Sequence, residues 1–243
     1  MAQGVQYEQQ AHSLFKENAP PSVTVFPQAG GHGIDIEFQH KSTPNRIGIE
    51  VKRRSTDTMG GTSLRFIDGS LSNTPLHPVN GFSTVFPEIQ GRLTLPIQQY
   101  IHRVNELITE HNKLSPEKYE LISGFPAKIP VLIRKQCVKE GFQRKIQSFY
   151  NFDIESWKAF YREKGCSYIQ IGDKGLFHFG ENPLNLPLPE ILGSISLELR
   201  LYAGGTGGKP CGKVEIAIKF KSLVCGKSPY TLDNKNHITE LFA

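Results

Sequence analysis

Two short segments with strict alternation of apolar and polar residues constrain the fold most strongly. They are Ile34-Asp35-Ile36-Glu37-Phe38 and Ile47-Gly48-Ile49-Glu50-Val51-Lys52. Successive side chains of a β-strand point to opposite sides, so each segment predicts a strand with one apolar face. We expect strands at residues 34–39 and 46–53, joined by a turn because Ser, Thr, Pro and Asn fill residues 42–45.

The polar faces of these two strands carry acids and a lysine. If the hairpin is centred on Thr43–Pro44, Asp35 lies opposite Lys52 and Glu37 lies opposite Glu50. A shift of two residues would still leave the acids and the lysine on one face. Paired carboxylates suit a hard cation such as Mg²⁺, for which Mn²⁺ can substitute.

A lysine beside such a cation can hold or activate an attacking water, or stabilise charge in the transition state. The trio therefore indicates phosphodiester hydrolysis. The alternative is an ordinary exposed strand face, on which Glu50 and Lys52 are solvated or weakly paired. For Glu37 we favour this second interpretation, with a place near the metal as the alternative.

The order of elements around these residues resembles the PD-(D/E)XK nuclease superfamily. Its members share a core of helix, three strands, helix and strand, with Asp in the second strand and Glu-x-Lys in the third. Here residues 4–17, which include Glu8, predict an amphipathic helix, and residues 22–26 predict the first strand. The glycine-rich run before Asp35 is similar to that of archaeal Holliday-junction resolvases. The match covers roughly residues 1–55, with Ile34 where the motif has Pro.

The resemblance implies a role for each matching residue. Asp35 and Glu50 would bind Mg²⁺, Lys52 would position the nucleophile, and Glu8 would contact the metal through water or complete the site. Basic residues beside the site would contact DNA phosphates, unless they are only turn residues. These candidate nucleic-acid-binding residues are His32, Arg53 and Arg54.

The rest of the chain predicts further helices and strands. Residues 55–86 are rich in Ser, Thr, Gly, Asn and Pro and show no strong periodicity, so we expect no regular structure there. Helices are expected at 95–113, from Ser115-Pro116-Glu117, within 135–150 and at 154–164, the last between an Asp153 cap and Gly165. Strands are expected at 128–134, 168–171, 176–179, 194–202 and 212–220.

These elements predict an α/β (α+β) fold with a restriction-endonuclease-like core. We expect a mixed central β-sheet flanked by helices, with additional C-terminal β-strands. No linker divides the chain, so we expect one nuclease domain over residues 1–243, with the catalytic core at about 1–180 and a β-rich elaboration at about 181–243.

Composition excludes several other classes of protein. The 243 residues include 28 Lys+Arg and 23 Asp+Glu, a mildly basic balance that is compatible with a polyanionic partner. No run is long and apolar enough for a membrane span, and no signal peptide is evident, so we expect a cytoplasmic protein. The glycine-rich run 204–209 is followed by Pro210 where a phosphate loop has Ser or Thr, so we expect a flexible hairpin loop there. We also expect no nucleotide cofactor. The spacing of the four cysteines matches no zinc site.

The extra length beyond a minimal core favours a type II restriction endonuclease that acts on double-stranded DNA. The resemblance implies that such an enzyme acts as a homodimer. Three alternatives stay open. The first is a structure-selective repair or recombination nuclease such as a Holliday-junction resolvase, and the second is an RNA-cleaving enzyme. The third is a catalytically inactive nucleic-acid-binding module, against which the complete acid–acid–lysine set argues.

Overall fold

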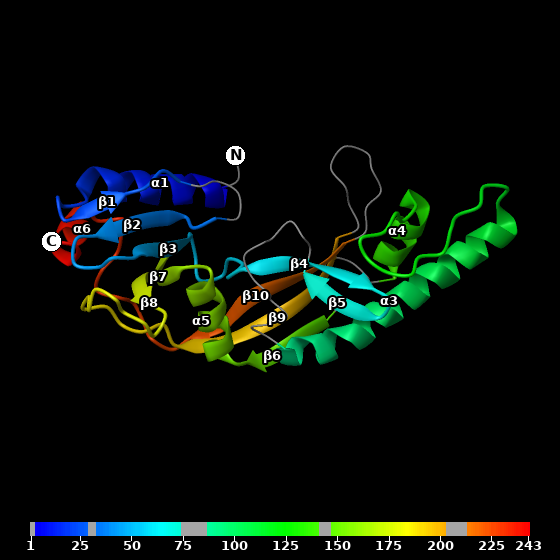
Figure 1. The fold of residues 1–243 in the computed structure, drawn as a ribbon. Helices are drawn as coiled ribbons and strands as arrows, with labels where there is room; N and C mark the ends of the chain where they lie inside the picture. The colour runs from blue at the N-terminus through cyan, green and yellow to red at the C-terminus, as the bar shows by residue number, and fades with distance from the viewer. Residues whose placement is uncertain (1–2, 29–32, 74–86, 141–146, 203–212) are drawn as a thin grey trace. The chain divides into compact units, whose positions relative to one another are not determined.

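The computed structural model describes residues 3–28, 33–73, 87–140, 147–202 and 213–243 (Figure 1). The chain forms two compact units, each built from separate segments. The first unit comprises Met1–Met59, Asn151–Ile195 and Lys219–Ala243, and the second comprises Gly60–Tyr150 and Ser196–Ile218. The chain passes back and forth between the two units, so neither unit is one continuous stretch of the sequence.

The first unit contains a five-stranded mixed sheet with the order β1-β2-β3-β7-β8. Neighbouring strands are antiparallel except for β3 and β7, which run parallel. The parallel pair requires a crossover, because the chain must return to the starting end of the sheet. The strands are β1 (Val23–Val25), β2 (Ile36–His40), β3 (Arg46–Lys52), β7 (Cys166–Ile171) and β8 (Gly175–His178).

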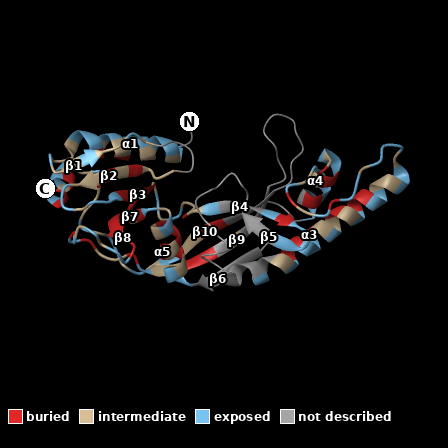
Figure 2. Ribbon diagram, viewed as in Figure 1, coloured by how far each residue is buried: buried red, intermediate tan, exposed pale blue. Residues whose placement is uncertain are grey.

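Helices cover both faces of this sheet (Figure 1). On one face, α1 (Gln3–Asn18) and α6 (Lys235–Leu241) bury Phe15 and Leu241 against the apolar side of β2 and β3. On the other face lies α5 (Ile154–Glu163), whose Tyr161 reaches the polar side of β3. The buried residues of the first unit lie between these layers (Figure 2).

Helix α5 begins and ends as the sequence predicts. The Asp153 carboxylate accepts hydrogen bonds from the backbone N–H groups of Glu155 and Ser156, at 3.1 and 3.0 Å. At the other end, Gly165 adopts a φ of +92°, which suits a residue without a Cβ. The Gly165 carbonyl then accepts a hydrogen bond of 3.0 Å from the N–H of Gly48, so the end of α5 lies against β3.

The second unit contains most of a sheet with the order β5-β4-β10-β9-β6 and, among its described residues, two helices. The helices are α3 (Pro87–Leu114) and α4 (Val131–Lys139). The strands are β4 (Gly61–Ile67), β5 (Ser70–Asn73), β6 (Gln147–Phe152), β9 (Gly193–Tyr202) and β10 (Lys213–Leu223). The expected C-terminal strands are therefore present, and the fold is mixed α and β.

The expectation of no regular structure at residues 55–86 is wrong for part of that stretch. Strands β4 and β5 form an antiparallel hairpin there, and Asp68 and Gly69 at its turn have φ values of +51° and +74°. Asp-Gly is a common pair in tight hairpin turns, since both residues tolerate positive φ. That dipeptide is the local signal for the hairpin. Residues 74–86 lie outside the described part of the chain.

Three expectations for residues 115–150 are wrong in whole or in part. The predicted strand at 128–134 gives way to α4, because the Pro130 carbonyl accepts the first helical hydrogen bond, from the N–H of Arg134, at 3.0 Å. Helix α4 ends at Lys139, and β6 occupies the end of the stretch expected to be helical. The segment that starts at Ser115 forms no helix. Among the residues that the structure describes, no helix is long and apolar enough to span a bilayer.

Replacement of Gly48 by Ala tests the contact between α5 and β3. A Cβ at this position would lie 2.6 Å from the Gly165 carbonyl oxygen and 2.9 Å from Ile34 Cγ2. We expect Gly48→Ala to lower the free energy of unfolding by about 1–3 kcal/mol, the usual cost of overpacking. Urea denaturation followed by circular dichroism measures this change.

The matched control is Gly4→Ala, whose new Cβ in α1 would meet nothing within 4 Å. Ala is preferred over Gly in helices, so this variant should lose no stability. Equal stabilities for both variants would contradict a close approach of α5 to β3.

Candidate catalytic site

The register between β2 and β3 sets which side chains lie together. Ile36 pairs with Ile49 and Phe38 pairs with Ile47, so the apolar residues of both strands share one face as expected. The hairpin is centred between residues 42 and 43, one residue earlier than assumed from the turn. Glu37 is consequently paired with Gly48 and not with Glu50, which corrects the expected register by two residues.

This register brings Asp35 level with Glu50, since Asp35 immediately precedes the Ile36–Ile49 pair. The acids therefore stay on one face in spite of the shift, because side chains two residues apart point to the same side of a strand. Glu37 lies away from them and forms an ion pair of 3.2 Å with Arg46 at the surface. Charge pairing is thus the outcome for Glu37.

Glu50 is a buried carboxylate held by two lysines. Only 3% of the residue is exposed. Its Oε1 accepts a hydrogen bond from the Lys52 ammonium, its Oε2 accepts one of 2.6 Å from Lys164 Nζ, and the Tyr161 hydroxyl lies 3.5 Å from Oε1. Burial alone would raise the pKa of Glu50, but the positive charges of Lys52 and Lys164 outweigh it and lower the pKa below 4.5. The group is therefore charged in the fold.

Asp35 has the opposite electrostatic balance. Its Oδ2 accepts a hydrogen bond of 2.7 Å from the backbone N–H of Val51. Burial, followed by repulsion from Glu50, raises the pKa of Asp35 from 3.8 to about 7, although Lys52 opposes the change. The two carboxylates are close enough to repel each other, and a further positive charge between them would stabilise the pair.

Lys52 lies among three acids. Burial lowers the pKa of this ammonium, but the charges of Glu50 and Asp35 raise it above its ordinary value, and Glu8 adds to the increase. Glu8 belongs to α1, on the face of the sheet opposite to α5. The structure thus brings Asp35, Glu50 and Lys52 within electrostatic range of one another, and Glu8 within range of Lys52.

Lys164 is the site residue that sequence reasoning missed. It follows α5 directly and lies more than a hundred positions from Glu50 in the chain. Its position depends on the parallel pairing of β3 with β7 and on the Gly48–Gly165 contact. The sequence does predict the helix end at residues 164–165, but neither periodicity nor spacing indicates which strand that end approaches.

The expected nucleic-acid-binding residues have different surroundings. Arg53 donates a hydrogen bond to the side chain of Gln3 and lies 3.9 Å from Asp57, so it already has two partners within the first unit. Arg54 is exposed. His32 lies outside the described residues. Arg53, which follows β3, thus connects this part of the chain to α1 through Gln3.

The donor set fits a hydrated Mg²⁺ ion. No group of three or more His, Cys, Asp or Glu side chains in the described segments is placed to hold a metal. Mg²⁺, however, keeps several waters and is commonly bound through one or two carboxylates. Asp35 and Glu50 supply two carboxylates whose mutual repulsion a cation would relieve. Comparisons of the chain with protein-family models, with curated proteins and with solved structures gave no match.

The raised pKa of Asp35 predicts a pH-dependent stability. Between pH 3.8 and about 7 the folded state binds more protons at Asp35 than the unfolded state does. The stabilisation from this group is complete below pH 3.8 and is lost as the pH rises to about 7. Asp35→Asn cannot titrate, so the stability of the wild type relative to this variant should fall with rising pH across that window.

Urea denaturation of both proteins at a series of pH values, in buffer free of divalent cations, measures the difference. A difference that stays constant across the window would contradict the proximity of Asp35 and Glu50 in a buried site.

Proposed function

We propose that this protein is a Mg²⁺-dependent DNA endonuclease whose active centre contains Asp35, Glu50 and Lys52, with Glu8 beside them. The observation that carries the proposal is the convergence of two carboxylates and an ammonium on one face of β2 and β3. The combination has the ligands for a hard cation together with a positive charge for phosphate. Mn²⁺ is expected to substitute for Mg²⁺.

The topology of the first unit supports a PD-(D/E)XK assignment. A helix, three antiparallel strands, a second helix and a parallel returning strand follow in the order α1, β1, β2, β3, α5, β7. This is the order that the resemblance implies. Most of the second unit enters the chain between β3 and α5, so the core helix and strand follow later in the sequence than in a minimal enzyme.

The chain's own residues indicate how the roles are divided. A bound Mg²⁺ would lower the pKa of a coordinated water and offset charge on the phosphate. Asp35 and Glu50 would hold the ion, and Glu8 would orient water near it. The raised pKa keeps Lys52 protonated, so its role is to donate hydrogen bonds and positive charge to the phosphate and not to remove a proton.

The size of the second unit favours a restriction enzyme over a minimal resolvase. Residues beyond the catalytic core provide the surface needed to contact base edges in duplex DNA and a second copy of the chain. We therefore propose a type II endonuclease that acts on double-stranded DNA as a homodimer.

Digestion of plasmid DNA in the presence of Mg²⁺ tests the proposed activity. We expect discrete fragments from the wild type, and loss of cleavage with retention of DNA binding for Asp35→Ala, Glu50→Ala and Lys52→Ala. The matched control is Glu37→Ala, an acid on the same strand whose partner is Arg46. Selective nicking of four-way junctions would instead favour a resolvase. Wild-type cleavage by Lys52→Ala would remove Lys52 from the mechanism.

Lys164 should act by positioning Glu50. Its ammonium holds Oε2 at 2.6 Å, and loss of a group that orients a metal ligand typically costs about 10–100-fold in activity or metal affinity. We expect such a loss in kcat for Lys164→Met, with partial recovery in Lys164→Arg. Mn²⁺ affinity, followed by calorimetry, should change in parallel.

Lys227→Met is the control for loss of an exposed lysine in the same unit. Recovery of stability in Lys164→Arg without recovery of the kcat and the Mn²⁺ affinity would contradict the positioning role.

A further inference from the structure

The net charge of the chain comes entirely from the second unit. Of the 28 Lys+Arg and 23 Asp+Glu, 14 basic and 9 acidic residues belong to the second unit, which leaves 14 of each in the first. The first unit, which contains the candidate active centre, is therefore neutral at pH 7 with His uncharged, and the second carries +5. By net charge, the second unit attracts a polyanion more strongly than the first does.

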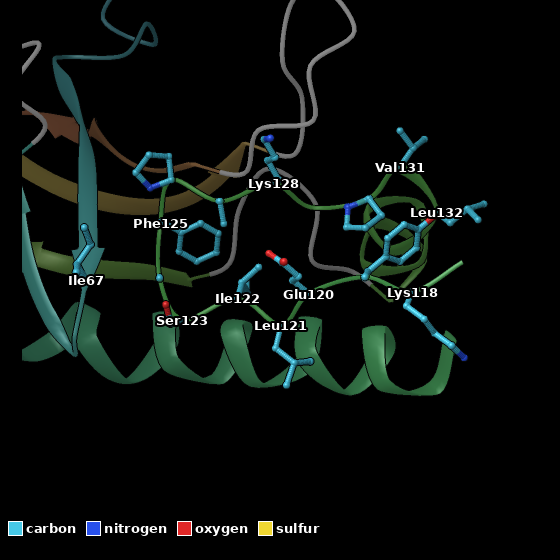
Figure 3. A pocket seen from close by; sticks show the side chains of 15 residues that line it. Ile67, Lys118, Glu120, Leu121, Ile122, Ser123, Phe125, Lys128, Val131 and Leu132 are labelled. Atoms are coloured by element: carbon cyan, nitrogen blue, oxygen red, sulfur yellow. The ribbon is translucent and has the colours of Figure 1, made fainter. Parts of the chain in front are cut away.

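A hollow of about 880 Å³ opens on the second unit (Figure 3). Its wall consists of Ile67 from β4, the irregular segment between α3 and α4, and the first residues of α4. Several apolar side chains at its edge face solvent: Leu121 is 61% exposed, Leu132 57% and Val131 47%. Exposed apolar side chains gathered around a hollow are typical of a binding surface.

The irregular segment is fixed to α3 by two asparagines. The side-chain amide of Asn105 donates to the carbonyl of Ile122 and accepts from its N–H, at 2.8 and 2.9 Å. Asn112, two turns later, makes the same pair of bonds to Tyr119, at 2.9 Å each. Each amide thus satisfies both backbone groups of one residue, as a neighbouring strand would.

A third anchor lies at Phe125. Its backbone N–H and carbonyl exchange hydrogen bonds of 2.8 and 3.0 Å with Phe66 of β4, and its ring stacks on Tyr100 at a centroid distance of 5.7 Å. The irregular segment of the wall is therefore anchored at three points although it forms neither helix nor strand. A preorganised surface loses less conformational entropy when it binds a partner.

Exposed lysines lie on the segments that form this hollow. Lys118 and Lys128 belong to its lining, and Figure 3 shows their ammonium groups directed away from each other. Lys135 and Lys139 are also exposed, and they follow Leu132 on the same face of α4 at a spacing of three and seven residues. Among the residues that line the hollow, Glu120 is the one acid.

We propose that this lysine-bordered hollow is a DNA-docking surface, on which Lys128, Lys135 and Lys139 contact phosphates while Leu121 and Leu132 contact sugars or bases. The inference rests on the proposed nuclease function. Its basis is charge complementarity, since positive charge borders the hollow and the unit as a whole is basic. Lys118 is engaged with the Asn112 carbonyl and contributes charge mainly at the edge.

Charge reversal of the lysines tests the surface. In a Lys52→Ala background, which prevents cleavage, the triple variant Lys128→Glu/Lys135→Glu/Lys139→Glu should bind a fluorescent DNA duplex at least tenfold more weakly. The plot of log affinity against log salt should become shallower by about 2–3, because each phosphate contact contributes about 0.9 to the slope. Leu132→Gln should weaken binding without a change in this slope.

The matched control reverses three exposed lysines of the first unit, Lys41→Glu/Lys227→Glu/Lys235→Glu, with the same change in net charge. Its affinity should remain within a few-fold of the parent. Equal losses in the two triple variants, or normal binding by the first, would overturn the docking surface while plasmid cleavage by the wild type still supports the nuclease. A wild type that neither binds nor cleaves DNA would overturn the proposed function and the docking surface together.

Discussion

The buried charge of Glu50 is the constraint on which the first unit depends. A carboxylate that is 3% exposed needs compensating charge, since desolvation of an unpaired ion is costly. Lys52 supplies one ammonium from the same strand, and Lys164 supplies the other from the end of α5. The ion pair between Lys164 and Glu50 requires α5 to end against β3. The close approach of Gly48 and Gly165 makes this possible. The parallel pairing of β7 with β3 keeps the end of α5, and with it Lys164, at this position. Structure and candidate chemistry are thus set by one ion cluster.

The alternating pattern predicts much of this site because strand geometry is local. Ile36, Ile47 and Ile49 lie in the core, whereas Glu50 and Lys52 lie on the opposite face, as their parity requires. Capping chemistry is equally local, and it locates α5 through Asp153 and Gly165. The expected register was wrong by two residues because it depends on the internal geometry of the turn, which composition does not determine. The acids stay together because a shift by an even number of residues preserves the face.

The remaining errors arose where tertiary contacts or short turn signals decide the structure. Isoleucine, valine and leucine around Pro130 have high strand propensity, but the proline terminates the preceding segment and its carbonyl starts α4. The hairpin of β4 and β5 depends on two residues, Asp68 and Gly69, within a stretch whose composition indicates a loop. Lys164 could not be assigned to the site from the sequence, since its contact with Glu50 spans more than a hundred residues. The local sequence pattern therefore predicts which residues share a strand face. Long-range packing decides which residues complete the ion cluster.

The separation of charge between the units has a consequence for how such an enzyme would work. Without a bound cation, the carboxylates of Asp35 and Glu50 would repel a phosphate, although Lys52 attracts it. Because the first unit has no net charge, it adds little long-range attraction for a polyanion that could offset this repulsion. In the proposed function the affinity for DNA would come largely from the second unit, which carries the excess positive charge. Under this arrangement the second unit determines affinity and its salt dependence. The proposed cleavage would depend on a divalent cation at Asp35 and Glu50, so DNA affinity and cleavage should respond to different substitutions.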